Sequence, residues 1–208
     1  MRIGFIGAGI VAQTISKHVL AVGHRVLLSN TRGPDSLAPL VKELGSGAEA
    51  GTPQQATEQD IVVLAANWPN VQQALFSIPD WKGRILVDTT NRLAGFTPLT
   101  LGDISGRTSS EIVADLAPGA RVVKAFNSVG AGQMVNPQFS GRKPTMIICG
   151  NNEGAKKSVT TLLDQFGWET EDMGPVEAAR AIEPLCVLWC IPGIARNDWS
   201  PHAFKLLR

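Results

Sequence analysis

The stretch RIGFIGAGIVA, residues 2–12, decides the fold of this chain. Residues 2–6 form a short apolar run that predicts a β-strand, and residues 10–21 continue with the apolar spacing of a helix. Between the strand and the helix, positions 7–12 read Gly-x-Gly-x-x-Ala. A strand, this glycine pattern and a helix, in that order, are typical of the first unit of a Rossmann-type dinucleotide-binding fold.

The residue types of this loop suit contact with a pyrophosphate. Gly7 permits a tight turn, Gly9 has no Cβ to keep the backbone away from the phosphates, and Ala12 lets the helix pack close to the strand. The start of the helix adds free N–H groups and a partial positive charge. A strand–turn–helix whose glycines serve only the turn is the alternative. We expect the cofactor to contact Gly7, Ala8, Gly9, Ile10 and Val11.

Strand and helix patterns alternate along the chain. Strands are expected over 2–6, 24–29, 48–51, 60–66, 84–89, 120–126, 145–149 and 168–173. Helices are expected over 10–21, 34–44, 71–78, 108–116 and 152–166, with a short helix opened by Thr52 as its N-cap. This alternation predicts an α/β fold, a Rossmann-type, doubly wound, mostly parallel sheet with right-handed crossovers.

The chain is expected to divide after Gly150. Residues 1–150 would form an NADP-binding Rossmann domain, and residues 151–208 a small C-terminal α/β to helical segment. That segment is too short for a core of its own, so it should pack on the sheet domain or on a second subunit. Residues 175–208 are expected to be mainly helical, with a break near Pro192 and Gly193.

The end of the second strand favours NADP(H) over NAD(H). An NAD site usually has an Asp or Glu here to hold the adenosine ribose, and this chain has none. It has instead Ser29, Asn30, Thr31 and Arg32. Hydroxyl and amide groups can donate to a 2′-phosphate, and an arginine can neutralise it. A merely polar loop is the alternative.

Later strands end in small residues, amides and hydroxyls that should line the same cleft. Parallel strands bring their carboxyl ends to one edge, where ligands bind. These groups suit a ribose, a nicotinamide carboxamide and a flat partner ring, although asparagines at strand ends also form Asx turns. The candidates are Ala65, Ala66, Asn67, Trp68, Thr89, Asn91, Ala125 and Asn127.

No general acid or base stands out at these strand ends, so no catalytic residue is assigned. Asp88 and Lys124 are the only charged candidates, and both are compatible with a structural role. Tyrosine is absent, which excludes the short-chain dehydrogenases with their Tyr-x-x-x-Lys pair. Direct hydride transfer between two bound cofactors needs mainly orientation and proximity.

The composition of the chain indicates which kinds of binding partner and which cellular compartment to expect. The net charge is +1, without a long run of one sign, which argues against nucleic acid. There are three cysteines, an odd and low count that favours a reducing compartment, and the cytoplasm is expected. Cys186 and Cys190 are spaced for core packing, and no metal site is expected. No secretory signal or bilayer-spanning segment is predicted; the nearest candidate, 181–195, is interrupted by charge, proline and glycine.

Several stretches together resemble the family of coenzyme F420-dependent NADP oxidoreductases. They are RIGFIGAGIVA (2–12), SNTRG (29–33), VDTTN (87–91), VVKAFN (122–127) and GPVEAARAIEPL (174–185). The NADPH-binding domain of the STEAP metalloreductases is similar too. The resemblance implies an NADP-binding Rossmann domain, a small helical C-terminal part and often a homodimer.

The resemblance also implies hydride transfer between NADPH and a deazaflavin, or a flavin in the metalloreductases. Residues 128–134 should face the acceptor, and they match no deazaflavin-specific motif. The main interpretation is therefore an NADPH-dependent reductase of F420, a flavin or another small acceptor. The alternatives are an NADP(H)-binding or sensing protein without turnover, and a small enzyme similar to β-hydroxyacid dehydrogenases or pyrroline-carboxylate reductases.

Overall fold

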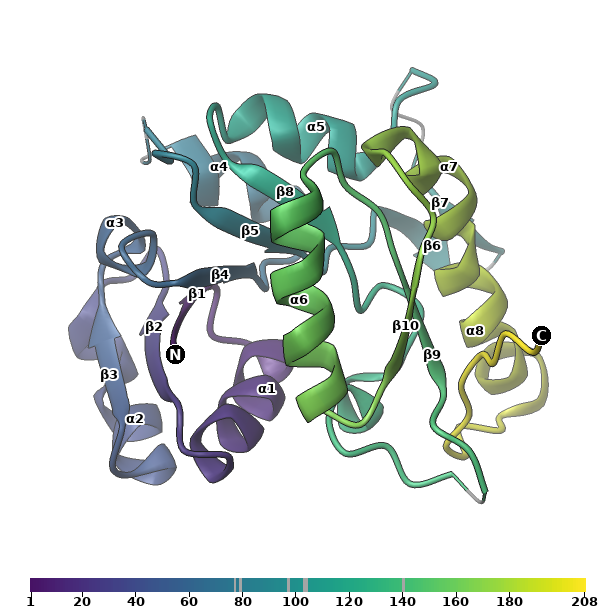
Figure 1. Ribbon diagram of the computed structural model, residues 1–208, viewed down its shortest axis with the longest axis horizontal. Helices are drawn as coiled ribbons and strands as arrows, with labels where there is room; N and C mark the ends of the chain where they lie inside the picture. The colour runs from purple at the N-terminus through teal and green to yellow at the C-terminus, as the bar shows by residue number, and fades with distance from the viewer. Residues whose placement is uncertain (77, 79, 97, 103–104, 140) are drawn as a thin grey trace.

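A six-stranded parallel sheet forms the centre of the computed structural model, which describes residues 1–76, 78, 80–96, 98–102, 105–139 and 141–208 (Figure 1). The strand order is β3-β2-β1-β4-β5-β8, and every adjacent pair is parallel. The strands are β1 (Arg2–Ile6), β2 (Arg25–Ser29), β3 (Ala48–Gly51), β4 (Ile61–Leu64), β5 (Ile85–Asp88) and β8 (Arg121–Lys124). This topology confirms the predicted doubly wound fold.

Helices cover both faces of the sheet, as crossovers between parallel strands require. They are α1 (Ile10–Ala21), α2 (Ala38–Leu44), α3 (Pro53–Ala56), α4 (Val71–Phe76), α5 (Ser109–Leu116), α6 (Glu153–Gln165), α7 (Ala179–Ile182) and α8 (Pro184–Arg196). Short 3-10 turns are η1 (Pro34–Leu37), η2 (Trp68–Asn70), η3 (Ala131–Gln133) and η4 (Val176–Ala178). Thr52 caps α3 through a capping box, which confirms its predicted role.

The central strand β4 shows why its sequence is continuously apolar. Ile61 and Val63 join a buried cluster with residues of α1 and α6 on one face of the sheet. Val62 and Leu64 join a second cluster with residues of α4 and α5 on the other face. Since successive side chains of a strand point to opposite faces, a strand buried on both sides needs an uninterrupted apolar run.

The C-terminal part adds a second small sheet. Strands β9 (Thr145–Ile148) and β10 (Glu169–Asp172) pair in parallel with each other. They meet the main sheet at an isolated antiparallel bridge between Lys124 and Cys149. The buried cluster that contains Ile61 and Val63 also includes Trp168 and residues of β1 and α6. It therefore spans the division at Gly150, which stays a prediction.

A short hairpin lies in a segment that was not assigned from the sequence. Its strands are β6 (Leu93–Phe96) and β7 (Leu99–Leu101), which pair antiparallel. Strands of four and three residues show too few alternations to be recognised as a pattern. The hairpin begins directly after the end of β5 and its polar extension, so it borders the carboxyl edge of the sheet.

The expected break at Pro192 and Gly193 is wrong, because α8 runs through both residues. Pro192 has no N–H to donate, but α8 is largely exposed on one side, where solvent can satisfy the freed carbonyl. Gly193 is instead required by packing, because a Cβ there would lie 2.3 Å from the Trp199 ring. Residues 175–208 are mainly helical, as expected, through η4, α7 and α8, although residues 197–208 contain no helix.

The short turn η4 and the helices α7 and α8 together form a helical stretch, Val176–Arg196, with a mean hydropathy of 1.4. By length and composition this stretch of 21 residues could cross a membrane, and 28% of the apolar window is buried in the fold. The expectation that no segment passes this test is therefore wrong. Core helices of globular proteins can have the same length and composition.

Candidate functional site

The loop between β1 and α1 adopts a conformation that only glycine accepts at position 7. Gly7 has φ +104°, and its amide donates a 3.0 Å hydrogen bond to the Ser29 carbonyl at the end of β2. A Cβ on Gly7 would lie 2.4 Å from the Ala65 carbonyl oxygen, after β4. The turn is thus fixed between the ends of β2 and β4, which flank β1, and any side chain on Gly7 would collide with the backbone after β4.

Gly9 differs from Gly7, because neither its backbone conformation nor its packing in the fold requires a residue without a Cβ. It is the N-cap of α1, its φ is an ordinary −79°, and no side chain caps the helix. A Cβ on Gly9 would meet no atom within 4 Å. The first N–H groups of α1 therefore open to solvent with their partial positive charge, beside a space that a side chain would narrow.

Two adjoining clefts lie at this edge of the sheet. The first cleft, of about 250 Å³, runs past the glycine loop and is lined by Gly7, Gly9, Asn30, Thr31, Ala65, Ala66 and Asn67, with η2 and α4 residues behind. The second cleft, of about 340 Å³, is lined by Val11, Trp68, Thr89, Thr90, Asn91 and Leu93. Ala65, Ala66 and Asn67 line both. The two clefts thus form one path at the edge of the sheet. This path crosses the point between β1 and β4 where the strand order reverses.

The residues after β2 point at the first cleft. The Asn30 carboxamide oxygen accepts from the Arg32 amide at 2.9 Å, and its nitrogen donates to the Ser36 hydroxyl at 3.0 Å. Thr31 is exposed at the cleft wall. Arg32 is exposed too, and its guanidinium has no hydrogen bond or ion pair to the residues that the structure describes. The Asx turn at Asn30 therefore presents a threonine hydroxyl and an uncommitted cation.

Ser29 has a structural role inside the sheet. Its side chain is fully buried, and its hydroxyl donates a 2.7 Å hydrogen bond to the Phe5 carbonyl. This hydroxyl is therefore engaged inside the sheet, and the contact of Ser29 with the cofactor stays a prediction. Ser29 ties β2 to β1, and its carbonyl holds Gly7.

The predicted residues near β5 and β8 separate into two groups. Thr89 and Asn91 line the second cleft. Ala125 is fully buried and Asn127 is 1% exposed, and neither lines either of the two clefts, so their contact with the cofactor stays a prediction. The Asn127 amide donates to the Ile182 carbonyl at 2.8 Å, which fastens the C-terminal helices over the end of β8.

Beneath the second cleft lies a buried ion pair. The Lys124 ammonium donates to Asp88 at 3.0 Å, to the Thr90 carbonyl at 2.6 Å and to the Ser109 hydroxyl at 3.1 Å. Burial works to raise the pKa of Asp88, but Lys124 and hydrogen bonds from Thr90 and Ser110 outweigh it and lower the pKa below its ordinary value. The interpretation of both charges as structural fits this geometry.

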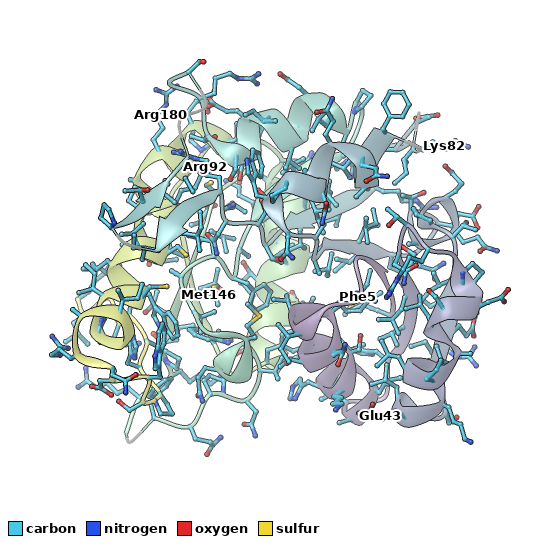
Figure 2. The ribbon with its side chains drawn as sticks, turned by 180° about the vertical axis from the view of Figure 1, so that it is seen from behind. Phe5, Glu43, Lys82, Arg92, Met146 and Arg180 are labelled. Carbon is cyan, nitrogen blue, oxygen red and sulfur yellow. The ribbon has the colours of Figure 1, made fainter. Side chains whose placement is uncertain are left out.

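Glu183 and Arg92 extend this network, and sequence reasoning missed both. Glu183 is 1% exposed; it accepts from the Ser109 amide and hydroxyl, each at 2.7 Å, at the start of α5. Arg92 donates to its other oxygen at 2.9 Å. Figure 2 shows Arg92 on the side that carries the C-terminal helices. A glutamate before Pro184 in an apolar stretch was the one available signal.

The cysteines are consistent with packing. Burial raises the pKa of the Cys149 and Cys186 thiols to about 12, which leaves them as thiols at neutral pH. Among the described residues, no group of three or more His, Cys, Asp or Glu side chains could hold a metal ion.

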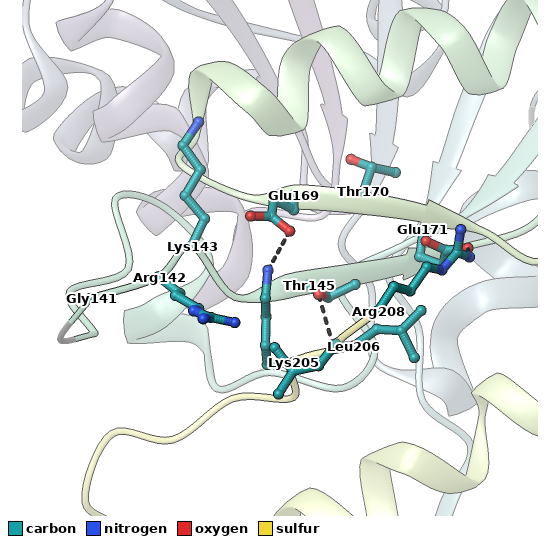
Figure 3. A pocket seen from close by; sticks show the side chains of 11 residues that line it. Gly141, Arg142, Lys143, Thr145, Glu169, Thr170, Glu171, Lys205, Leu206 and Arg208 are labelled. Atoms are coloured by element: carbon teal, nitrogen blue, oxygen red, sulfur yellow. Dashed lines mark hydrogen bonds and ion pairs between the residues drawn. The ribbon is translucent and has the colours of Figure 1, made fainter.

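A larger cavity of about 600 Å³ lies apart from the glycine loop, between β9, β10 and the chain's last residues (Figure 3). Its charges are mostly paired: Lys205 binds Glu169, Arg208 binds Glu171, and Lys143 binds Asp164. Leu206 donates through its amide to the Thr145 hydroxyl at 3.1 Å. The sequence predicted no site here. The ion pairs of Lys205 and Arg208 hold the C-terminal segment against β10, which accounts for these charges.

Comparison with known proteins connects this geometry to a family. Residues 2–92 match the model of the family described as NADP oxidoreductase, coenzyme F420-dependent. The F420-dependent NADP reductase of Methanocaldococcus jannaschii is 24% identical over 190 residues, which cover 88% of this chain and 85% of that protein. A solved structure of a candidate F420-dependent NADP reductase from Arthrobacter sp. FB24 is 27% identical, with a TM-score of 0.89 and 100% of both chains covered.

This chain is also similar to metalloreductases. Metalloreductase STEAP3 of Rattus norvegicus is 29% identical over 198 residues, which cover 92% of this chain. The aligned part is 38% of that protein, so this chain spans well under half the length of the metalloreductases that it matches. These matches confirm the resemblance predicted from the sequence.

Proposed function

We propose, from its similarity to the coenzyme F420-dependent NADP oxidoreductases, that this chain is an NADP(H)-dependent oxidoreductase. In this proposal hydride passes between NADPH and a small acceptor, which is a deazaflavin such as F420, a flavin or another small compound. The observation that carries the proposal is the open start of α1 at Gly9, where free N–H groups face a space kept clear of side chains.

The pyrophosphate fits at this start. Gly7, Ala8 and Gly9 supply the backbone, and the uncapped N–H groups of Ile10 and Val11 can donate to it. The Ala8 carbonyl already accepts a 3.0 Å hydrogen bond from the side-chain nitrogen of Gln13, which keeps the loop shaped without a ligand. A loop that is formed in advance loses little conformational freedom on binding.

The adenosine end fits the first cleft. Thr31 can donate to a 2′-phosphate there, and the uncommitted Arg32 guanidinium can bind it in a bidentate manner. Asn30 holds this turn through the Arg32 amide. No carboxylate lines the cleft within the described residues, so nothing there repels the phosphate or competes for Arg32.

The nicotinamide end fits the second cleft, since Ala65, Ala66 and Asn67 line both clefts and connect them. When bound, NADPH would supply the hydride. Trp68, Thr89 and Asn91 would orient the ring and exclude water from its face. The described residues that line the two clefts include no Asp, Glu, His, Lys or Arg, so proximity and orientation would carry the reaction.

We also propose a cytoplasmic homodimer that acts on small molecules, without nucleic acid or a membrane as partner. The helix α8 exposes Leu188, Ile191 and Ile194 at 52%, 43% and 39%. These residues lie three positions apart and form one apolar strip, which a second copy could cover. Sedimentation of the purified chain tests this part: a dimer supports it, and a concentration-independent monomer contradicts it.

Turnover is the experiment that tests the proposed function. Oxidation of NADPH is followed at fixed enzyme concentration with F420, FMN or FAD as acceptor. Turnover of any of these acceptors with NADPH, and much slower turnover with NADH, is the expected result. A Gly9→Ala variant serves as control, because it should lose activity while it keeps the fold.

Two other outcomes would replace the proposal. Tight NADPH binding without turnover of any acceptor would indicate a binding or sensing protein, a function that the lack of charged residues in the clefts would also allow. Turnover of a hydroxy acid or a pyrroline carboxylate, but not of a flavin or deazaflavin, would indicate an enzyme of the β-hydroxyacid dehydrogenase or pyrroline-carboxylate reductase type.

A further inference from the structure

The hairpin of β6 and β7, which borders the second cleft, adds little to the apolar core. Leu93, its first residue, lines the cleft. None of the side chains described for residues 93–101 is buried, and none belongs to a buried apolar cluster. β7 lies against α8, in which only Cys186 and Gly193 are buried (Figure 1). A two-stranded hairpin is only marginally stable by itself, so polar contacts are needed to hold it in place.

Arg92 fastens the base of this hairpin. Its carbonyl accepts a 2.7 Å hydrogen bond from the amide of Gly102, which follows the second strand. Its guanidinium donates to the Gly102 carbonyl. The backbone and the side chain of one residue thus join the two ends of the hairpin at the same place. A guanidinium can do this and still bind a carboxylate, because its donors point in several fixed directions.

Glu183 connects this base to the buried part of the protein. One of its oxygens accepts from the Arg92 Nε at 2.9 Å, and the other accepts from the Ser109 amide and hydroxyl. The Ser109 hydroxyl also accepts from Lys124, the cation of the buried pair beneath the second cleft. The side chains of Arg92 and Glu183 are 16% and 2% exposed, so salt screens their attraction only weakly.

Arg92 itself lines neither cleft, although its neighbours in sequence, Asn91 and Leu93, line the second. Its side chain reaches Glu183 on the side of the C-terminal helices. Any effect of Arg92 on a bound ligand therefore passes through the backbone of residues 91–93, which forms part of the cleft wall. Such an effect can be large, because a displacement of reacting groups by about 1 Å can lower a rate about 100-fold.

We propose that the Arg92–Glu183 pair sets the position of the hairpin as a wall of the second cleft, and that Arg92 is a positioning residue for the group bound there. This inference rests on the proposed function, in which that group is the nicotinamide end of NADP(H) with its hydride acceptor. The first cleft should not depend on the pair, since no described residue of the hairpin lines it.

Hydrogen exchange tests the first half of the proposal without turnover. In Arg92→Met the hairpin loses its side-chain contacts with Glu183 and Gly102, while Glu183 keeps Ser109. We expect the amides of β6, β7 and Gly102 to exchange at least about tenfold faster than in wild-type protein, and those of β4 to be unchanged. Arg107→Met is the matched control, because its pair with Asp115 is exposed. Unchanged exchange in the hairpin of Arg92→Met overturns the proposal.

Kinetics test the second half. NADPH oxidation is measured with the acceptor among F420, FMN and FAD that wild-type protein turns over. We expect kcat to be at least about tenfold lower in Arg92→Met and unchanged in Arg107→Met. The dissociation constant of 2′-phospho-ADP-ribose, which lacks the nicotinamide ring, should equal that of wild-type protein in both variants. An Arg92→Met protein that is less stable but keeps the wild-type kcat overturns the positioning role.

Arg92→Lys provides a milder variant in case Arg92→Met does not fold. Its single ammonium can replace only part of the guanidinium contacts, so its exchange rates and kcat should lie between those of wild-type protein and Arg92→Met. Wild-type values in Arg92→Lys would mean that a charge alone is sufficient, which would contradict the fixed geometry on which the proposal depends.

Binding separates this inference from the proposed function. If wild-type protein turns over none of the three acceptors, the ratio of the dissociation constants of NADP⁺ and 2′-phospho-ADP-ribose replaces kcat. This ratio should rise about threefold or more in Arg92→Met and stay constant in Arg107→Met; a constant ratio in both overturns the inference. If neither ligand binds wild-type protein, the proposed function is wrong, and the inference fails with it.

Discussion

Two polar stretches follow strands of the same sheet, and they serve opposite purposes. Asn30-Thr31-Arg32 follows β2; Asn30 and Thr31 line the first cleft, and the Arg32 side chain next to them is exposed. Thr89-Thr90-Asn91 follows β5, and each of its side chains donates one hydrogen bond into the protein. The difference arises because the C-terminal helices cover the β5 and β8 end of the sheet, through Glu183 and the Ile182 carbonyl. Polarity at a strand end therefore does not by itself indicate a binding residue.

The largest effect should come from breaking the covered end. Lys124→Met leaves Asp88 buried without its cation, and removal of one partner of a buried pair typically costs about 3–5 kcal/mol. We expect a loss of this size in the free energy of unfolding, measured by urea denaturation. Lys17→Met is the matched control, since the Lys17–Glu43 pair is exposed and such pairs contribute at most about 1 kcal/mol. Equal losses in the two variants would contradict the assignment of the Lys124 pair to the core.

The next effect separates the two glycines of the loop. Gly7→Ala puts a side chain at a positive φ and against the Ala65 carbonyl, so stability should fall by about 2 kcal/mol or more. Gly9→Ala should leave stability within about 0.5 kcal/mol, because its Cβ meets open space, while the NADPH affinity falls about tenfold or more. Thermal denaturation and equilibrium NADPH binding measure both. A Gly9→Ala variant that binds NADPH like the wild type would remove the main support for the phosphate site.

The smallest effect appears only in acid. The pKa of Asp88 is lowered in the folded protein, so this group contributes stability that is fully present above its unfolded value of about 3.9 and is lost as the pH falls through the folded value. We expect the urea midpoint to decline below about pH 4, whereas the contribution of Asp88 to it should be complete and independent of pH near neutral pH. Asp88→Asn is less stable at pH 7 and should show a shallower decline in acid. An unchanged acid profile in this variant would contradict the role of Asp88.

The sequence predicted the fold well where the pattern is local and repeated. The apolar run of β4 indicates burial on both faces, and the Gly-x-Gly-x-x-Ala loop indicates a strand–turn–helix unit, each within a few residues. The parallel sheet follows from the alternation of strands and helices along the chain. The hairpin of β6 and β7 was missed because its strands are too short to show a period. The break at Pro192 was wrong because proline is tolerated in α8, whose exposed side can be solvated.

The candidate site was only partly predictable, for a tertiary reason. Gly7, Gly9 and Thr31 lie at the clefts, as their place in the motif indicates. Ser29 and Asn127 have the right residue types but bind backbone carbonyls that come from other parts of the chain. Glu183 lies about ninety positions from Arg92 in sequence, so no local pattern links them. Long-range partners decide which polar side chain is free.

The affinity for NADPH against NADH, in wild-type protein and in Arg32→Ala, tests the central claim most directly. The two cofactors differ only in the 2′-phosphate, which is proposed to meet Thr31 and Arg32. We expect wild-type protein to bind NADPH at least about tenfold more tightly, and Arg32→Ala to lose most of that preference with little change in the NADH dissociation constant. Equal dissociation constants for the two cofactors in wild-type protein would contradict the account.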